Sequence, residues 1–324
     1  MTHRGPNIEA ISGAREALGD AILRTPVLRC AGLEDLLDNG TIVEGKLEFL
    51  QRTGTFKARG ALATVRSLAG EQLESGITAV SAGNHAIAAA YAAKAAGTHA
   101  KVVMIETANP YRIEACKRYG AEVVIAGDAH AAFDVAEGIQ RDEGRTLVHP
   151  FEGPGVALGA GTLGLEICEQ LPDFEALLVP VGGGGLIAGV SNAVKQLRPD
   201  CTIVGIEPEG ADSMSRSFAS GKPESIDKVR TMADSLGAPY ALPFSFALTR
   251  DNVDELALVS DEALRRAMGV LYRHMKFAVE PACAAATAAL LGPLRERLAG
   301  KRVALLFCGS NTDWATWQQH AILD

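Results

Sequence analysis

The stretch LEFLQRTGTFKARGA, from Leu47 to Ala61, places one lysine, Lys57, in a short polar segment. An apolar run precedes the segment, and a run with the spacing of a helix follows it. A lysine on the surface of a helix does not need the Thr-Gly-Thr-Phe sequence that stands just before this one. The stretch therefore indicates a chemical role for Lys57, and groups that act with it should follow elsewhere in the chain.

The composition is that of a large, mildly acidic globular protein. At 324 residues the chain is long for one domain and comfortable for two. Hydrophobic residues make up 48% and aromatic residues only 5%, so the core has to be mainly aliphatic. The net charge of −8 argues against a nucleic-acid-binding protein, which needs a basic surface.

Cysteine usage and hydropathy predict a cytoplasmic protein. None of the six cysteines stands in a Cys-x-x-Cys pair, and a chain of this size does not need disulfides, so reduced thiols are the simpler interpretation. The polar start of the sequence lacks the apolar region of a secretory signal. No uncharged apolar run reaches about 18 residues, so we expect no membrane span.

Short apolar runs alternate with longer amphipathic ones, which predicts an α/β protein with mostly parallel sheets. The expected strands are Ile77–Val80, Val102–Ile105, Val123–Ala126, Leu177–Val181, Ile203–Ile206 and Val303–Phe307. The expected helices are Phe56–Leu68, His85–Ala96, Tyr111–Tyr119, Ala129–Glu143, Thr162–Leu171, Leu186–Leu197, Asp261–Met275 and Pro281–Leu298.

A Gly- and Pro-rich passage, HPFEGPGVALGAGT from His149 to Thr162, separates two groups of strands. We expect two α/β domains with a cleft between them: a small domain of residues 67–153, and a large domain of residues 1–66 and 154–324. Ligands of such sheets bind at the carboxyl ends of the strands. The segments that follow the strands are therefore the candidates for a site.

Ser81-Ala82-Gly83-Asn84-His85 follows the strand Ile77–Val80 and precedes an Ala-rich helix. Small residues at the start of a helix leave backbone N–H groups free, and with the helix dipole these suit an anion such as a substrate carboxylate. The alternative is an ordinary N-cap provided by Ser81 or Asn84. Spacing alone does not decide between the two interpretations.

Four consecutive glycines, Gly182-Gly183-Gly184-Gly185, follow the strand Leu177–Val181 and precede the helix that starts at Leu186. Glycines in this position allow backbone amides to surround a phosphate, with the helix dipole behind them. A loose turn is the structural alternative. We favour the phosphate site, because four glycines in a row suit no regular element.

The same loop also fits a dinucleotide-binding pattern. Gly183, Gly185 and Ala188 match G-x-G-x-x-A, and Glu207 lies at the end of the next expected strand, where an acidic residue can hold a ribose. An NAD-dependent oxidoreductase is therefore an alternative from another reaction class. It explains neither Lys57 nor the segment around Asn84.

The last expected strand is followed by Cys308-Gly309-Ser310-Asn311. A small thiol beside a glycine at a strand end could face a ligand ring. Taken alone, such a cysteine is more often a buried structural residue.

Together these segments resemble the fold-type-II pyridoxal 5′-phosphate enzymes, in the branch of serine/threonine dehydratases and serine racemases. Thr53–Ala61, TGTFKARGA, is similar to the family motif TGSFKxRGA, with Thr55 in place of serine. The resemblance runs from Arg24-Thr25-Pro26-Val27 through Lys46-Leu47-Glu48 to Cys308-Gly309-Ser310-Asn311. It implies a fold like that of the tryptophan synthase β subunit, with two open, mostly parallel sheets, flanking helices and an active site in the cleft between the domains.

The resemblance also implies a role for each candidate residue. Lys57 would be the catalytic lysine that forms a Schiff base with the cofactor, and Phe56 would back the cofactor ring. The cofactor phosphate would be held by Gly182, Gly183, Gly184, Gly185 and the amide of Leu186. Asn84 would bind the ring hydroxyl, and Cys308 would face the ring nitrogen. The substrate carboxylate would be held by Ser81, Ala82, Gly83, Asn84 and His85.

The implied reaction is the dehydration and deamination of a β-hydroxy-α-amino acid to a 2-oxo acid and ammonia, by a cytoplasmic homodimer. Racemisation of serine or another amino acid is the alternative within the family. It needs a proton donor on the opposite face of the ring, where racemases of the family have a serine after the position of Ser81. Here the residue is Ala82, so we favour elimination.

Departures from the family pattern bear on the substrate. Ala160 stands where the family has glutamine in a GQGT segment, and this loss of bulk suggests a larger side chain, such as that of phenylserine. A cation site seen in some relatives would involve Glu207, Ala211 and Asp212, but its usual aspartate is Ser213 here, so the site stays open and we assign no metal ligands. Because the sequence stops at Asp324, we also expect no regulatory domain and no feedback by isoleucine.

Overall fold

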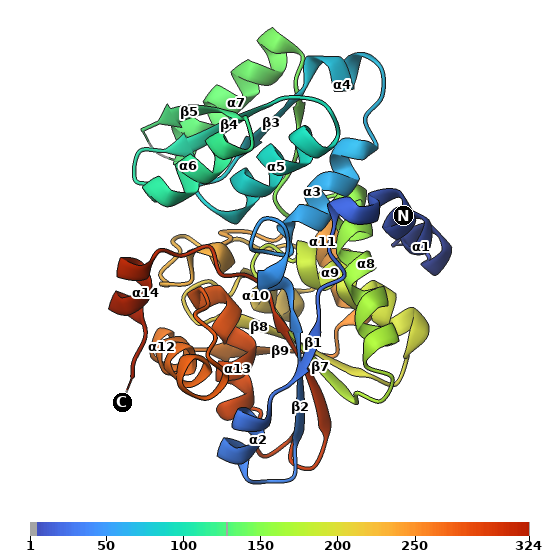
Figure 1. The fold of residues 1–324 in the computed structure, drawn as a ribbon, viewed down its shortest axis with the longest axis vertical. Helices are drawn as coiled ribbons and strands as arrows, with labels where there is room; N and C mark the ends of the chain where they lie inside the picture. Colours follow the sequence, from blue (N-terminus) through green and yellow to red (C-terminus); the bar gives the residue numbers. More distant parts are fainter. Residues whose placement is uncertain (1–4, 128, 324) are drawn as a thin grey trace.

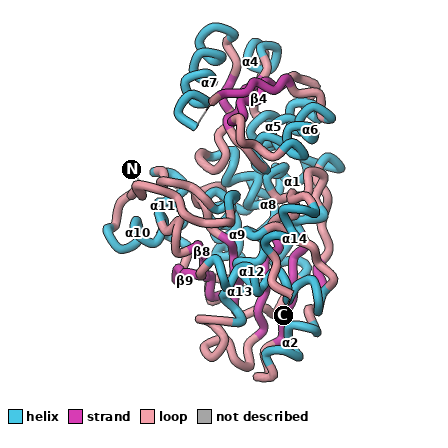
Figure 2. Tube along the Cα trace, turned by 90° about the vertical axis from the view of Figure 1, so that its left-hand side faces the viewer, coloured by secondary structure: helices cyan, strands magenta, loops and turns pink. Residues whose placement is uncertain are grey.

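The computed structural model describes residues 5–127 and 129–323. Each of its two lobes is built around one sheet, and α3 (Lys57–Arg66) lies between them (Figure 1). Figure 2 shows the smaller lobe, with β4 and helices α4 to α7, at one end of the molecule. The cleft expected from the sequence therefore has a lobe on either side, with the helix that starts at Lys57 at the junction.

The larger sheet has six strands in the order β1-β2-β10-β7-β8-β9. The strands are β1 (Val27–Arg29), β2 (Ile42–Leu47), β7 (Ala176–Pro180), β8 (Thr202–Pro208), β9 (Glu255–Val259) and β10 (Arg302–Phe307). All pairs are parallel except β1 with β2. Strand β10 is central, and its Leu305 pairs with Gly45 on one side and Leu178 on the other. Helices cover both faces of such a strand, which explains its continuous apolar sequence.

The smaller sheet has four parallel strands in the order β5-β4-β3-β6. The strands are β3 (Ile77–Val80), β4 (Ala100–Ile105), β5 (Glu122–Ala126) and β6 (Thr146–Leu147). The helices of this lobe are α4 (Glu71–Ser75), α5 (Asn84–Ala95), α6 (Pro110–Arg118) and α7 (Ala129–Glu143). The core of this lobe includes α3, whose Leu62 and Val65 pack in one cluster with Ile77 and Ala89.

Helices of the larger lobe surround its sheet. Besides α3 they are α1 (Ile8–Leu18), α2 (Ala31–Leu37), α8 (Pro154–Gln170), α9 (Gly185–Leu197), α10 (Ser213–Ser220), α11 (Pro243–Asn252), α12 (Asp261–Val270), α13 (Ala285–Leu291) and α14 (Trp314–His320). Single turns complete the lobe: the 3-10 segments η1 (Gly19–Ala21), η2 (Glu48–Leu50), η3 (Asp234–Leu236) and η5 (Pro281–Ala284), and the π-turn η4 (Leu271–Met275).

All six predicted strands are present, but strands β1, β2, β6 and β9 were not predicted. The helix expected over Asp261–Met275 is α-helical only to Val270 and continues as the π-turn η4. Two other predicted helices differ more. We expected a loop up to Thr162, whereas α8 already begins at Pro154. Its glycines serve close packing: a Cβ on Gly159 would lie 2.4 Å from the Arg59 carbonyl oxygen, so α8 and α3 touch by their backbones. The helix expected over Pro281–Leu298 is also wrong, because α13 ends at Leu291, before Gly292.

The element order brings the predicted site segments together. The glycine run follows β7, Ser81–His85 follows β3, and Cys308 follows β10. Each therefore lies at the carboxyl end of a parallel strand, where ligands bind in open α/β sheets. The domain division at residues 66/67 and 153/154 stays a prediction.

Within residues 5–127 and 129–323, no helix is both long enough and apolar enough to cross a bilayer.

Candidate active site

Lys57 is the first residue of α3 and is half-buried at the junction of the lobes. Its Nζ donates a hydrogen bond of 2.5 Å to the Pro150 carbonyl oxygen. Removal of the ammonium group from water lowers the pKa of Lys57 to about 8, although Cys308 and Glu280 act in the opposite direction. A lysine in this state has a larger neutral fraction near neutral pH than an exposed lysine.

The polar segment before Lys57 is a tight loop bound to the end of β10. Gly54 has a φ of +73°, and a Cβ there would lie 2.5 Å from Asn311 Oδ1, so glycine is required on both counts. The N–H of Phe56 donates to the Cys308 carbonyl oxygen at 3.1 Å. Thr55 Oγ1 accepts from the Lys57 N–H at 3.0 Å, which caps the start of the helix. The loop thus sets Lys57 beside Cys308.

Arg59, the arginine of the TGTFKARGA motif, anchors α3 through buried ion pairs. Its guanidinium is buried and contacts Glu48 at 2.8 Å and Glu166 at 2.7 Å. Lys46 also contacts Glu166, at 2.6 Å. These four charges join β2, η2, α3 and α8 beneath the site. The sequence comparison flagged Arg59 only as part of a motif, and the structure identifies it as an anchor of α3.

The glycine run forms a turn in which Gly183 and Gly185 have no space for a Cβ. A Cβ on Gly183 would lie 2.3 Å from the Phe151 ring, and a Cβ on Gly185 would lie 2.5 Å from the Phe151 carbonyl oxygen. Gly184 is the N-cap of α9 and has a φ of +89°. The first N–H groups of α9 have no acceptor within the helix. The turn therefore presents backbone donors and a helix dipole to the cavity, as expected for a phosphate cradle.

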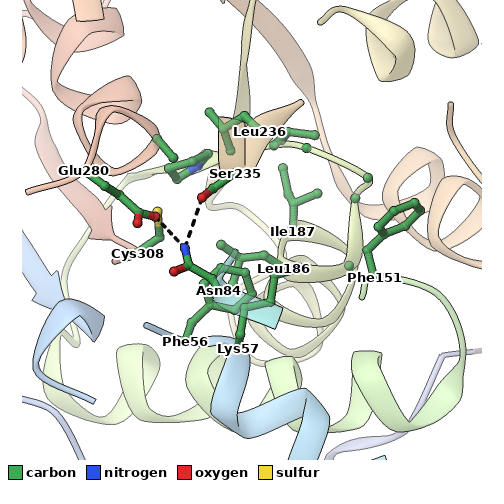
Figure 3. Close-up of a pocket in the computed structure, with 17 residues that line it drawn as sticks. Phe56, Lys57, Asn84, Phe151, Leu186, Ile187, Ser235, Leu236, Glu280 and Cys308 are labelled. Carbon is green, nitrogen blue, oxygen red and sulfur yellow. Dashed lines mark hydrogen bonds between the residues drawn. The ribbon is translucent and has the colours of Figure 1, made fainter. Parts of the chain in front are cut away.

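Asn84 is buried at the start of α5, and its amide has a fixed orientation. Its Oδ1 accepts from Asn311 Nδ2 at 2.9 Å. Its Nδ2 donates to Glu280 Oε1 at 2.8 Å and to Ser235 Oγ at 3.1 Å (Figure 3). Asn311 Nδ2 also donates to the Thr53 carbonyl oxygen at 2.8 Å. The sequence analysis missed Glu280 and Ser235, because both lie more than 150 residues away in the chain and neither belongs to a local pattern.

The segment before α5 is shaped by its own backbone. The N-cap is Gly83, without a side-chain cap, so the N-cap alternative for Ser81 or Asn84 is wrong. Ser81 Oγ instead accepts from the Gly83 N–H at 3.1 Å. His85 Nε2 contacts the Val148 carbonyl oxygen at 2.7 Å. Burial and the nearby Lys57 lower the pKa of His85 to about 3, so the imidazole is neutral.

An ion pair crosses between the lobes beside this segment. Arg112 of α6 contacts Asp234 of η3 at 2.5 Å, and its Nε donates to the Asn311 carbonyl oxygen at 3.2 Å. A Cβ on Gly83 would lie 3.2 Å from Arg112 Nη1. Arg112 and Asp234 both line the opening that contains Ser81 and Ala82. No local pattern in the sequence pointed to this pair.

Cys308 is buried directly after β10. A hydrogen bond with Cys283, together with burial, raises the pKa of Cys308 well above its usual range. The thiol is therefore neutral, and a neutral thiol is a weak hydrogen-bond donor. All six cysteines are free thiols, as the spacing of the cysteines indicated.

Glu207 does not extend into a ligand site. Its carboxylate accepts from the N–H groups of Met214 and Ser215, at 2.9 and 2.8 Å, at the start of α10. In the part of the chain that the structure describes, no group of three or more His, Cys, Asp or Glu side chains could hold a metal ion.

The predicted residues meet in two adjoining spaces. One cavity is lined by Phe56, Lys57, Asn84, Gly182, Gly183, Gly184, Gly185, Leu186 and Cys308. Ser81, Ala82, Gly83, Asn84 and His85 line the neighbouring opening, which shares Lys57 and Gly183 with that cavity. A lysine of lowered pKa thus stands between a glycine turn at one helix start and free backbone amides at another.

A family model described as pyridoxal-phosphate dependent enzyme matches residues 18–309. The chain belongs to this family. It is 51% identical to the phenylserine dehydratase of Ralstonia pickettii over 97% of this chain and 96% of that protein. It is 37% identical to the L-threonine ammonia-lyase of Thermotoga maritima over 94% of this chain and 76% of that protein.

Solved structures of pyridoxal-phosphate enzymes have the same fold. Maize serine racemase superimposes with a TM-score of 0.92 at 32% identity, covering 97% of this chain and 96% of that one. A threonine deaminase gives a TM-score of 0.90 at 39% identity, covering 95% and 99% of the two chains. These comparisons confirm the predicted fold class, family and cofactor, and they replace the oxidoreductase alternative.

The cavity fits pyridoxal phosphate. Gly183 and Gly185 have no Cβ, so the glycine turn packs directly against Phe151 and lines the cavity with backbone that a phosphate can approach. Lys57 supplies the amine that such an enzyme needs, and Phe56 lies beside it, with its ring centroid 5.3 Å from Nζ. In the part of the chain that the structure describes, the buried Glu280 Oε2 has no hydrogen-bond partner and so leaves a polar position for a ligand.

Proposed function

We propose that this pyridoxal-phosphate enzyme dehydrates and deaminates a β-hydroxy-α-amino acid of the phenylserine type to a 2-oxo acid and ammonia. The identity of 51% with a phenylserine dehydratase over nearly the whole chain supports the substrate class. L-threonine ammonia-lyases at 37% and 38% identity support the same reaction on a smaller side chain.

The chain offers a separate place for each part of the cofactor. Gly182–Gly185 and the Leu186 amide would hold the phosphate, Phe56 would lie against the ring, and Asn84 would donate to the ring hydroxyl. Cys308 would face the ring nitrogen as a neutral thiol. When bound, the cofactor supplies an aldehyde for covalent attachment and a ring that withdraws electrons from Cα of the amino acid.

Two groups of the chain would act on the substrate. The first N–H groups of α5, after Gly83, would hold the substrate carboxylate, because they lack acceptors within the helix. Lys57 would accept the proton removed from Cα, since its lowered pKa keeps part of it neutral. His85 would stay neutral and hold the segment in place through Val148.

The observation that carries the choice of reaction is Ala82 on the wall of the substrate opening. Its methyl group has no proton to give to the face of Cα opposite Lys57, whereas racemisation requires a donor there. Loss of the β-hydroxyl as water needs a proton on that oxygen, which the proton that Lys57 takes from Cα can balance, but it needs no donor on the face of Cα opposite Lys57. Elimination is therefore the reaction that these residues can support.

The side chain of the substrate would lie in the opening that contains Ala82. Val80, Phe151 and Ala238 give this opening apolar walls next to Lys57. Ala160, which the sequence analysis linked to a larger substrate, instead lines a smaller cavity beside Lys57, with Val156. Any effect of Ala160 on specificity would therefore pass through the packing around Lys57.

A panel of β-hydroxy amino acids tests the proposal. Ammonia and 2-oxo acid would be measured with L- and D-phenylserine, threonine and serine, and the amino acid that remains would be analysed by chiral chromatography. We expect kcat/KM for phenylserine to exceed that for threonine at least about tenfold, as an apolar pocket selects for buried methylene and ring groups. A kcat/KM far higher for threonine would remove the phenylserine assignment, and racemisation faster than ammonia release would remove the lyase.

We further propose that the enzyme is a cytoplasmic homodimer with the domain bounds given above. The family resemblance supports this proposal. Light scattering on the purified holoenzyme should give twice the mass of the 34.0 kDa chain. A monomer mass would contradict it.

A further inference from the structure

Glu280 is the one carboxyl group among the described residues that line the cofactor cavity. It stands just before η5, and only 1% of it is exposed. Its Oε1 accepts from Asn84 Nδ2 at 2.8 Å. Its Oε2 is buried and has no hydrogen-bond partner within residues 5–127 and 129–323. A buried carboxyl oxygen without a partner is costly, so its presence here calls for a ligand group.

The neighbours of Glu280 fix the direction in which Asn84 donates. Asn311 Nδ2 donates a hydrogen bond to Asn84 Oδ1, and Asn84 Nδ2 donates one to Glu280 Oε1. The second hydrogen points to Ser235 Oγ at 3.1 Å, within the cavity (Figure 3). These contacts fix the amide with its NH2 group toward Glu280 and Ser235, so the hydrogen that is now given to Ser235 Oγ is the one that a cofactor could take over.

We propose that Glu280 is a positioning residue for the cofactor ring: its Oε1 directs the Asn84 N–H into the cavity, and its Oε2 hydrogen-bonds a polar group of the ring. The proposal depends on the cofactor that the family shares and is independent of the substrate. Cys308 cannot replace Glu280 in this hydrogen bond to the ring, because its thiol is neutral and a weak donor.

The charges around Glu280 make its second oxygen sensitive to pH. Burial raises the pKa of Glu280 to about 7 and Asp234 acts in the same direction, while Arg112, the hydrogen bond from Asn84 and the nearby backbone N–H of Asn311 act in the opposite direction. Two other titratable groups face it from neighbouring elements, Lys57 of α3 and Cys308 after β10. As the pH falls through this pKa, Glu280 would change from a charged acceptor to a protonated group that can donate from Oε2. The cofactor ring would then contact a neutral Glu280 at lower pH and a charged Glu280 at higher pH.

The absorption spectrum of the bound cofactor tests this directly, because it depends on the charge of the ring. We expect the wild-type holoenzyme to change its spectrum as the pH crosses neutrality. Glu280→Gln should lose this transition while it keeps an oxygen that can accept from Asn84. A Glu280→Gln spectrum that titrates as the wild type does, or a wild-type spectrum that is constant across neutrality, would overturn the proposal.

Glu207→Gln is the matched control. Glu207 is also fully buried, and burial likewise raises its pKa to about 7, but its oxygens are bound at the start of α10 and it does not line the cavity. Its variant should keep the wild-type transition. Loss of the transition in both variants would mean that the effect arises from general destabilisation and would overturn the role of Glu280.

Affinity of the apoenzyme for pyridoxal phosphate gives a second readout. Glu280→Ala removes both oxygens and frees the Asn84 amide. We therefore expect the dissociation constant for pyridoxal phosphate to rise about tenfold, because one hydrogen bond to a charged group is lost. Glu280→Gln should stay within about threefold of the wild type, because the Asn84 contact survives. Equal affinity of Glu280→Ala and wild type would contradict the positioning role, whatever substrate the enzyme uses.

Discussion

At the scale of single residues, the shape of the cofactor cavity depends on glycines that leave space for other atoms. Gly183 and Gly185 lie against Phe151, and Gly54 lies against Asn311. Each of these contacts would be closer than 3 Å if a Cβ were present. Packing therefore requires the glycines of the turn, and the same lack of side chains would let a phosphate approach the backbone, as proposed.

Gly183→Ala should weaken cofactor binding. Its new Cβ would lie 2.3 Å from the Phe151 ring, so the ring or the turn has to move and the amides leave their positions. We expect the dissociation constant for pyridoxal phosphate to rise at least about tenfold, in line with the cost of overpacking a tight site. Fluorescence titration of the apoenzyme measures this change.

Gly13→Ala is the control for that variant, because Gly13 lies within α1 and nothing lies within 4 Å of its Cβ position. It should leave the affinity unchanged and stabilise the helix by up to about 1 kcal/mol. Wild-type affinity in Gly183→Ala would show that the turn does not hold the phosphate.

The structure brings together the candidate residues that a local pattern marked, while their roles stay predictions. Lys57, Asn84, the glycine run and Cys308 each follow a strand or start a helix, and all of them line one cavity. Glu280 escaped notice, because its contact with Asn84 joins residues 196 positions apart. Such a contact arises only from the tertiary fold, and a lone glutamate before a proline gives no signal of it.

At the scale of elements, α3 is the part of the fold that the site depends on most. It carries Lys57 at its first position, and Arg59 one half-turn later ties it to η2 and α8. The attraction of Glu48 and Glu166 raises the pKa of Arg59, while burial opposes this shift. The helix that begins at Lys57 is thus fixed by a buried ionic cluster and not only by apolar packing.

Arg59→Met should destabilise the protein by about 3–5 kcal/mol, because it leaves Glu48 and Glu166 with too few positive partners in the interior. The pKa of Glu48 is lowered in the wild type, chiefly by Arg59 acting against burial, so its contribution to stability is present above the unfolded pKa and lost as the pH falls through the folded pKa. The difference between variant and wild type should therefore shrink in acid. Urea denaturation at neutral and acidic pH measures both effects.

Lys117→Met is the surface comparison for Arg59→Met, since it removes an ion pair with Glu114 whose side chains are 55% and 59% exposed. It should cost less than about 1 kcal/mol. A similar loss in both variants would contradict the anchoring role of Arg59.

The elements that were mispredicted show why local patterns were insufficient. The glycines between residues 153 and 161 suggested a loop, but within α8 Gly159 allows backbone contact with α3, because a Cβ there would lie 2.4 Å from the Arg59 carbonyl oxygen. Strands β1 and β6 have three and two residues and lack a clear alternation of burial. Tertiary packing determines both the start of α8 and the presence of the short strands β1 and β6.

At the scale of the whole molecule, the site exists only where the two lobes meet. Asn84 and Arg112 come from the smaller lobe, and Glu280, Ser235 and Asp234 come from the larger one (Figures 1 and 3). The hydrogen bonds of Asn84 and the ion pair of Arg112 with Asp234 therefore connect the lobes across the cavity. Parallel sheets that place their strand ends in one cleft make this arrangement possible.

The covalent attachment of the cofactor to Lys57 is the central claim, and peptide mass spectrometry after borohydride reduction of the holoenzyme tests it most directly. Trypsin cleaves after Arg52 and Arg59, and a modified Lys57 resists cleavage, so the account predicts one peptide, Thr53–Arg59, that carries the mass of the reduced cofactor. An unmodified Lys57, or an adduct on another lysine such as Lys46, would contradict the account.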